Sequence, residues 1–282
     1  MEKSPIIFLI DNGSLRAEAT LGLRCLASEL SVRMGRKVLP VSLLHSDKIS
    51  AIKLWGKKAQ TVKNTLRRWI EADGRSFVFL PLFLGPSRAI TGYLPELIKD
   101  ARKQAPDLDV VIAPPLAGEN VEAPDMRLAK ILADHVRQKL KDSGLNAARV
   151  AVIDHGTPEK AVNRVRNAVA AQVRSLLNSD FTEVAACSME RREGAEYDFN
   201  EPLLENLDKL ENWQGSDLIV AMLFLLPGRH AGLEGDVAEI CQKLTERAAF
   251  RSVEQTGLMG KHPLLIDILA DRLDTALKRI KQ

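Results

Sequence analysis

Two histidines and one glutamate in the second half of the chain have the side chains needed to hold a divalent metal ion. His155 lies in the sequence Asp-His-Gly-Thr, Glu190 precedes two arginines, and His230 follows Pro-Gly-Arg. Imidazole nitrogens and a carboxylate oxygen form a reasonable site for a borderline divalent metal ion. Taken singly, each residue is explained as well by a helix cap, a surface loop or a solvated charge run. A metal site therefore depends on their being brought together.

Each of the three residues follows a predicted strand. Continuous apolar runs near residues 149–154, 181–189 and 216–225 are typical of strands covered on both faces, and therefore of a parallel sheet. Ligands of open parallel sheets bind beyond the carboxyl ends of the strands, and neighbouring strands lie ~5 Å apart. We therefore expect the two imidazoles and the carboxylate to converge at one edge of one sheet.

The chain of 282 residues repeats itself at an offset of 137 to 143 residues. Residues 10–14 match 153–157, residues 82–88 match 223–229, and residues 131–134 match 268–271, in the same order. Fixed-period self-similarity is the mark of a duplicated structural unit. The polar stretch 141–146 contains the predicted boundary. We expect an N-terminal repeat at 1–143 and a C-terminal repeat at 144–282.

Each repeat alternates strands with amphipathic helical stretches such as 161–177 and 263–280. The other predicted strands lie near 5–11, 37–44, 76–84, 108–113 and 250–255. This alternation predicts an α/β fold with right-handed crossovers. The expected architecture is two similar three-layer domains, each a four-stranded parallel sheet flanked by helices.

The first repeat keeps the expected scaffold and loses the expected metal ligands. Asn12 occupies the place of His155, and Ala89 stands opposite His230. Aligning residues 43–45 with 188–190 places His45 opposite Glu190. We therefore expect the chemistry in the C-terminal repeat and a degenerate site in the N-terminal one.

Composition excludes several classes of protein. Forty Lys and Arg against 37 Asp and Glu leave a formal charge of only +3, too balanced for a nucleic-acid binder by bulk electrostatics. Three scattered cysteines argue against a disulfide framework, a zinc ribbon or an iron–sulfur cluster, and favour a reducing compartment. The apolar run 5–10 is too short for the core of a signal peptide, and the run 218–227 is too short for a membrane span. We expect a cytoplasmic protein with neither a membrane nor a nucleic-acid partner.

The strand-end motifs resemble the class II chelatases, the sirohydrochlorin cobaltochelatases and ferrochelatases of the CbiX kind. The resemblance rests on His155-Gly156-Thr157, on Glu190, and on residues 223–230 (LFLLPGRH) after the third strand. Residues 261–265 and 268–271 also look like that family's closing helix. The resemblance covers nearly the whole chain as two tandem copies, and its most specific part is the Pro-Gly-Arg-His loop.

This resemblance implies a lyase that inserts Co²⁺ or Fe²⁺ into sirohydrochlorin or a related tetrapyrrole, in cobalamin, siroheme or porphyrin biosynthesis. The metal is then a substrate held between His155 and His230, and no cofactor is permanently bound. Glu190 assists as a ligand or as a base for the pyrrole protons. The choice among cobalt, iron and nickel stays open, because these ligands suit all three.

The resemblance also implies a cleft between the two domains that binds the macrocycle. Its carboxylates are met by arginines and by polar groups at the strand ends. The candidates are Arg229, Arg191, Arg192 and Thr157 in the second repeat, with Asn12, Ser14, Arg16, His45 and Arg88 in the first. The loop 231–237 is longer and richer in glycine than is usual in that family, which leaves the roles of Glu234 and Asp236 open.

Two other functions compete with the chelatase. A non-catalytic carrier of a tetrapyrrole or a metal is suggested by the degenerate first repeat. A phosphohydrolase of the histidine type is suggested by Arg and His beside glycine-containing turns, although no Arg-His-Gly signature follows the first strand. The oligomeric state is either a monomer or a homodimer, because a two-repeat chain can form within itself what a half-length chain forms as a dimer.

Overall fold

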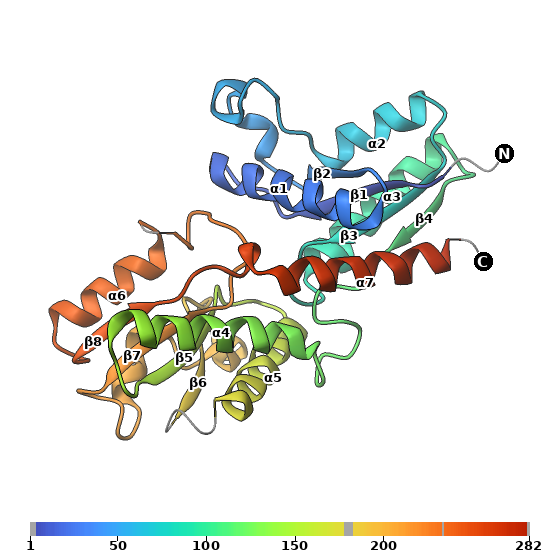
Figure 1. The fold of residues 1–282 in the computed structure, drawn as a ribbon. Coiled ribbons are helices and arrows are strands. Elements are labelled where there is room, and N and C mark those ends of the chain that lie inside the picture. Colours follow the sequence, from blue (N-terminus) through green and yellow to red (C-terminus); the bar gives the residue numbers. More distant parts are fainter. Residues whose placement is uncertain (1–3, 178–182, 233, 281–282) are drawn as a thin grey trace. The chain divides into compact units, whose positions relative to one another are not determined.

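The computed structural model describes residues 4–177, 183–232 and 234–280, which contain two four-stranded parallel sheets (Figure 1). The first sheet has the order β2-β1-β3-β4 and is formed by β1 (Ile6–Asp11), β2 (Val38–Ser42), β3 (Ser76–Pro81) and β4 (Asp109–Ile112). The second has the order β6-β5-β7-β8 and is formed by β5 (Arg149–Asp154), β6 (Val184–Ser188), β7 (Asp217–Met222) and β8 (Ser252–Gln255). The predicted α/β fold and its parallel sheets are confirmed.

The strands are apolar on both faces because helices cover both faces of each sheet. In β1, Ile7 to Ile10 are all at most 2% exposed, and all six residues of β7 are buried. Alternate side chains of a strand point to opposite faces, so a strand covered twice reads as one continuous apolar run.

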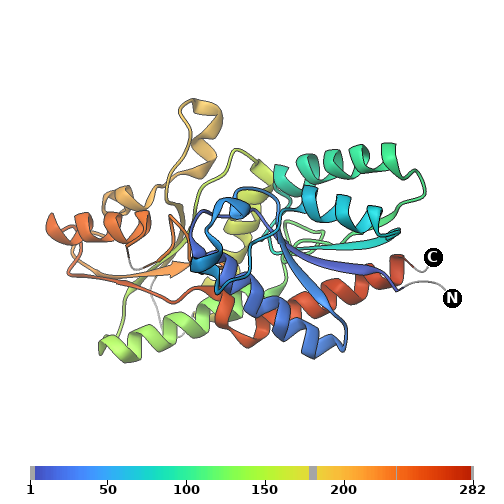
Figure 2. The same cartoon turned by 90° about the horizontal axis from the view of Figure 1, so that it is seen from above.

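The first compact unit comprises Met1–Glu119 and Leu265–Gln282. On one face of its sheet, α2 (Val62–Glu71) and α3 (Leu94–Gln104) pack against the rings of Phe8, Phe77 and Phe79. The helices α1 (Ala17–Met34) and α7 (Pro263–Arg279) lie side by side elsewhere in the unit (Figures 1 and 2). Arg33 pairs with Asp267 between these two helices, and Arg272 of α7 donates to the carbonyls of Pro115 and Leu116.

The second compact unit comprises Asn120–Leu264. Here α4 (Met126–Ser143) packs against α5 (Lys160–Leu176) and β7. The core of the unit also includes side chains of α6 (Asp236–Glu246), β6 and β7. Among the described residues, no helix is long and apolar enough to cross a membrane.

The compact units differ from the sequence repeats by one helix each. The helix α4 closes the first repeat in sequence but belongs to the second unit, and α7 closes the second repeat but belongs to the first unit. The match between residues 131–134 and 268–271 lies in these two helices. Each unit is therefore completed by the last helix of the other repeat.

The predicted alternation of strands and helices is wrong between β6 and β7. Residues 189–216 form two 3₁₀ helices, η4 (Ala195–Asn200) and η5 (Leu204–Lys209), and no α-helix. Pro202 has no N–H to donate to a helix, and its carbonyl accepts from the backbone N–H of Ser188. In the first unit the equivalent connection contains η1 (Ser46–Lys48), η2 (Ala51–Leu54) and then α2.

Asp11 ends β1 with a carboxylate that has no cation beside it among the described residues. Its Oδ1 is buried and accepts no hydrogen bond. The adjacent helix α1 supplies the apolar Leu23 where the equivalent helix α5, 143 residues later, supplies Arg166. Burial raises the pKa of Asp11 from 3.8 to about 6, although hydrogen bonds from Ser42 and Gly13 favour the charged form.

We expect Asp11 to make the protein less stable as the pH rises from 4 to above 6. In that window the folded carboxyl holds a proton that the unfolded one has released, so the free energy of unfolding falls as pH rises. Asp11→Asn should remove this loss and be more stable than wild type by about 3 kcal/mol at pH 7.5, but not at pH 4. Urea denaturation across this range measures both proteins, with the exposed Asp274→Asn as control. A difference between Asp11→Asn and wild type that is independent of pH contradicts the assignment.

Candidate metal site

His155 and His230 are brought together in the second unit. His155 directly follows the end of β5, and His230 lies in the loop between β7 and α6. Their ring centroids are 4.3 Å apart, and the ring planes are inclined at 60°. The strands β5 and β7 are hydrogen-bonded neighbours, which is why the segments beyond their carboxyl ends meet.

Glu190 contacts His155 from the segment after β6. Its Oε1 lies 3.3 Å from Nε2 of His155, with the two side chains 59% and 44% exposed. The backbone places them: the N–H of Glu190 donates to the carbonyl of His155. Gly156 permits this approach, because it has a φ of +94° and a Cβ there would lie 1.9 Å from the carbonyl oxygen of Glu190.

Both imidazoles are held through Nδ1. The Nδ1 of His230 is 2.6 Å from Oδ2 of Asp236, and that of His155 is 3.1 Å from the carbonyl of Gly156. A carbonyl only accepts, so the His155 contact forms when Nδ1 carries the proton, and a carboxylate favours the same tautomer in His230. The Nε2 lone pairs are then available as ligands. Nε2 of His155 lies 3.3 Å from the carboxylate of Glu190. Both atoms are hydrogen-bond acceptors in this tautomer, so this contact requires a proton or a metal ion between them.

The three side chains do not form a closed cage. Among the described residues, no three His, Cys, Asp or Glu side chains are placed so that they could hold a metal ion as they stand. The imidazoles meet edge to face, so binding to one ion requires the rings to rotate. Glu190 is more than half exposed and has room to follow.

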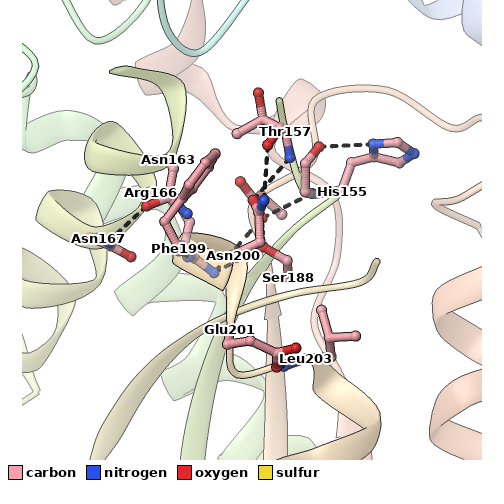
Figure 3. Close-up of polar contacts among 12 residues, drawn as sticks. His155, Thr157, Asn163, Arg166, Asn167, Ser188, Phe199, Asn200, Glu201 and Leu203 are labelled. Atoms are coloured by element: carbon pink, nitrogen blue, oxygen red, sulfur yellow. Dashed lines mark hydrogen bonds and ion pairs between the residues drawn. The ribbon is translucent and has the colours of Figure 1, made fainter. Parts of the chain in front are cut away.

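A buried polar network supports the turn that carries His155 (Figure 3). Oδ1 of Asp154 accepts from the hydroxyl of Ser188 at 2.8 Å and from the N–H of Gly156 at 3.1 Å. Nη1 of Arg166 donates to the same hydroxyl at 3.1 Å and lies 3.9 Å from Asp154 Oδ1. Arg166 is only 1% exposed. Burial raises the pKa of Asp154, and the guanidinium of Arg166 opposes that shift.

Asn200 clamps the next residue of the turn. Its Oδ1 accepts from the N–H of Thr157 at 3.1 Å, and its Nδ2 donates to the carbonyl of Thr157 at 2.9 Å (Figure 3). Asn200 is fully buried at the end of η4. The segment that begins with Glu190 thus returns to hold the turn of His155, and one local structure positions both side chains.

The arginines of the second unit that are predicted to bind substrate differ in their ion pairs and in their exposure to solvent. Arg191 forms ion pairs with Asp198 and Glu201 within its own loop. Arg192 is exposed, 5.8 Å from the centroid of the Tyr197 ring. Arg229 is also exposed, with Nε 3.7 Å from Asp236. Arg191 therefore stabilises the loop after Glu190, whereas Arg192 and Arg229 keep their guanidinium groups largely in solvent.

The first unit has the same turn but lacks the candidate metal ligands of the second unit. Asn12 is exposed and lies where the second unit has His155, and Ser14 donates its N–H to Ser46 where Thr157 donates to Asn200. Arg16 and Arg88 are exposed. The structure places no imidazole beside Asn12 from the equivalent of His230, because that position is Ala89.

The alignment of His45 with Glu190 is wrong by one residue. Ser42 pairs with Asp11 as Ser188 pairs with Asp154, so Ser42 and Ser188 are equivalent. The N–H of Leu44 donates to Asn12 as that of Glu190 donates to His155. Leu44 is therefore the counterpart of Glu190, and His45 is the counterpart of Arg191. The correct register has an offset of 146, at which Val38 matches Val184 and Ser42 matches Ser188, so the sequence did contain a signal for it.

Sequence reasoning missed three residues that support this site: Asp236, Arg166 and Asn200. The sequence leaves the role of Asp236 open, because its contact with His230 depends on how the loop folds. A signal did exist for Arg166, because a cation stands in a helix where the equivalent position is Leu23. Asn200 lies in a connection without helical periodicity.

The cysteines of the second unit are not metal ligands in this fold. Cys187 and Cys241 are buried in its hydrophobic core. Burial raises the pKa of Cys241 to about 12 and that of Cys187 further, so both stay neutral thiols.

Arg166→Leu recreates in the second unit the residue of the first, and we expect it to destabilise the protein by ~3–5 kcal/mol, because Asp154 is left buried without its cation. Adding Asp154→Asn should restore much of that stability, since the amide is neutral. Urea denaturation of both variants measures the effect. A single variant as stable as wild type means that the pair contributes nothing.

Comparison with known protein families finds the same family in both halves of the chain. The sequence profile of the family described as CbiX matches the chain twice, over residues 7–138 and 149–276. No curated protein sequence matches the chain.

Solved structures share the whole fold. SirB from Bacillus subtilis with Fe³⁺ has a TM-score of 0.69 at 17% identity, over 99% of this chain and 98% of that one. SirB from Bacillus subtilis subspecies spizizenii in complex with cobalt gives 0.69 at 15% identity, over 98% and 97%. A CbiX described as the terminal enzyme of siroheme biosynthesis in denitrifying bacteria gives 0.56 at 14% identity, over 97% and 99%. At these identities the likeness concerns the fold.

The two profile matches follow the two repeats and leave out only the ends and a short connection. The predicted family is thereby confirmed: the chain belongs to the CbiX family, in a form with two tandem copies.

Proposed function

We propose that this protein is a sirohydrochlorin chelatase that inserts Co²⁺ or Fe²⁺ into the macrocycle. The observation that carries the proposal is the meeting of His155, His230 and Glu190 beyond three adjacent strands, with both Nδ1 atoms engaged. Membership of the CbiX family supports it, and so do the similar folds of SirB proteins, which were solved with Fe³⁺ and with cobalt.

In this proposal the metal ion is a substrate held by the Nε2 atoms of the two histidines and by Glu190. Neutral imidazoles release such an ion more readily than thiolates do, which suits a transfer reaction. Insertion exchanges one divalent ion for two pyrrole protons. The exposed carboxylate of Glu190 is placed to accept a proton beside the metal and to release it to solvent.

Asp236 serves as a positioning residue for His230. Its carboxylate accepts from Nδ1, fixes the tautomer and orients the ring, so that Nε2 faces the ion. Its own place is set by the backbone, because the N–H of Asp236 donates to Arg229 and that of Val237 donates to His230.

The repeat at 144–282 supplies the metal chemistry in this account, and the repeat at 1–143 supplies only contacts to the tetrapyrrole. The proposed contacts are Asn12, Ser14, Arg16, His45 and Arg88, together with Thr157, Arg192 and Arg229 of the second repeat, while Arg191 holds the loop through its ion pairs. Carboxylates of the macrocycle are the groups that such arginines recognise.

His155→Ala should lower the rate of metal insertion at least 100-fold, because it removes a ligand and leaves Glu190 without its partner. The assay follows the absorbance of sirohydrochlorin mixed with Co²⁺ or Fe²⁺ and the purified protein. His135→Ala, a histidine on α4 outside the site, is the matched control and should keep the wild-type rate. Equal rates for wild type and His155→Ala would refute the catalytic role, and stoichiometric binding without turnover in wild type would identify a carrier.

Asp236→Ala should weaken Co²⁺ binding ~10–100-fold, because the ring of His230 loses its anchor. Asp236→Asn should recover part of the affinity, since its amide oxygen still accepts from Nδ1. Titration with Co²⁺, followed by visible absorption, measures both variants. If the alanine variant binds Co²⁺ like wild type and has the same absorption spectrum, Asp236 does not position His230.

A further inference from the structure

The connection between β2 and α2 in the first unit exposes two large apolar side chains. Ile52 is 88% exposed and Trp55 is 78% exposed. Both belong to the segment 46–58, which contains η1 and η2 (Figure 1). Exposed aromatic and branched side chains cost solvation free energy, and neighbouring ones mark binding surfaces more often than isolated ones do.

This segment is firmly anchored beneath its exposed side chains. Leu54 is fully buried with Ile49 and Ala59 in a small cluster of its own. From α1, Arg24 donates to the carbonyl of Leu54 at 2.9 Å and to that of Lys57 at 2.6 Å. Trp55, between these two carbonyls, has a left-handed backbone with φ of +56°, which is costly for a residue other than glycine. The backbone that carries the exposed indole of Trp55 is therefore held in place by these contacts.

The charge of the segment is strongly positive. Lys48, Lys53, Lys57 and Lys58 are exposed, and within the part of the chain that the structure describes none of them forms an ion pair. Asp47 is the only acidic residue from 46 to 58. The segment 46–58 thus combines two exposed apolar side chains with four lysines that form no ion pair within the described part of the chain.

The segment lies at the edge of the sheet where ligands bind, because it follows the carboxyl end of β2. The equivalent connection of the second unit carries Glu190 and Asn200, and its rings of Tyr197 and Phe199 are half-buried. The two copies have therefore diverged: one connection carries metal chemistry, and the other an exposed basic and apolar surface.

We propose that Ile52, Trp55 and the four lysines bind the tetrapyrrole substrate. The inference rests on the proposed function and names a recognition surface for it. A tetrapyrrole is a planar apolar ring bordered by carboxylates, so its face packs on the indole and the isoleucine while its carboxylates pair with lysines. The occupant is chosen by this double complementarity, since an apolar partner alone leaves the four cations unmatched.

The test measures the binding of metal-free sirohydrochlorin to the full chain. Trp55→Ala, and separately a triple variant of Lys53, Lys57 and Lys58 to Gln, should each raise the Kd about tenfold or more. Both should raise KM for the tetrapyrrole in metal insertion and leave kcat and Co²⁺ binding unchanged. The triple variant should also show a weaker dependence of Kd on salt than wild type. The controls are Val32→Ala, another exposed apolar residue, and a triple Gln variant of the exposed Lys99, Lys243 and Lys278.

Wild-type Kd and KM in both test variants, in a protein that inserts metal, overturn the proposal and leave the chelatase function standing. A change of oligomeric state in Trp55→Ala with unchanged tetrapyrrole affinity also overturns it, and assigns the patch to self-association. If wild type neither binds nor metallates sirohydrochlorin, both the proposed function and the assignment of this surface to the tetrapyrrole are refuted.

Discussion

The close backbone approach beyond the first two strands of the second repeat determines where two of the three candidate ligands, His155 and Glu190, lie. In the second unit the turn at Gly156 passes so near the carbonyl of Glu190 that only a glycine fits, and in the first unit Gly13 passes Leu44 in the same way. The positive φ of these glycines brings the residue before each turn and the segment after the neighbouring strand together. His155 and Glu190 occupy this junction, so their meeting follows from the fold and precedes any metal.

Both units have buried polar groups under that junction, but among the described residues only the second has a buried cation there. Arg166 and Asp154 are joined through the hydroxyl of Ser188, and Asn200 holds Thr157 from both sides. In the first unit Leu23 leaves Asp11 without a cation, and the buried hydroxyl of Ser46 lies within hydrogen-bond distance of both the N–H and the carbonyl of Ser14. The Arg166–Ser188–Asp154 network, costly unless its members are satisfied, lies in the unit that carries the candidate metal ligands.

Much of the fold is predictable from the sequence because it depends on local patterns. The apolar runs predict all eight strands, and the helical stretches 161–177 and 263–280 correspond closely to α5 and α7. The exchange of α4 and α7 between the units is not predictable, since the repeat pattern is the same whichever sheet a closing helix covers. The missing helix between β6 and β7 is a failure of the repeat argument, because the connections have diverged in length and composition.

The meeting of the candidate ligands is predictable, because segments beyond the carboxyl ends of neighbouring parallel strands lie together. The residues that hold these ligands in position are not predictable in this way. His155, Glu190 and His230 each follow a strand, so the sheet order brings them together. The misplacement of His45 shows the limit, because one residue of register separates it from the position of Glu190. Asp236 reaches His230 only through the path of a loop that has no periodic pattern.

A crystal structure of the Co²⁺ complex, with the ion located by anomalous scattering, tests the central claim most directly. We predict one ion in the second unit, ~2.1 Å from Nε2 of both His155 and His230, with an oxygen of Glu190 in its coordination sphere and Asp236 still on Nδ1 of His230. An ion bound elsewhere, for example at His135 and His262, or bound through Nδ1 of His230, would contradict this account.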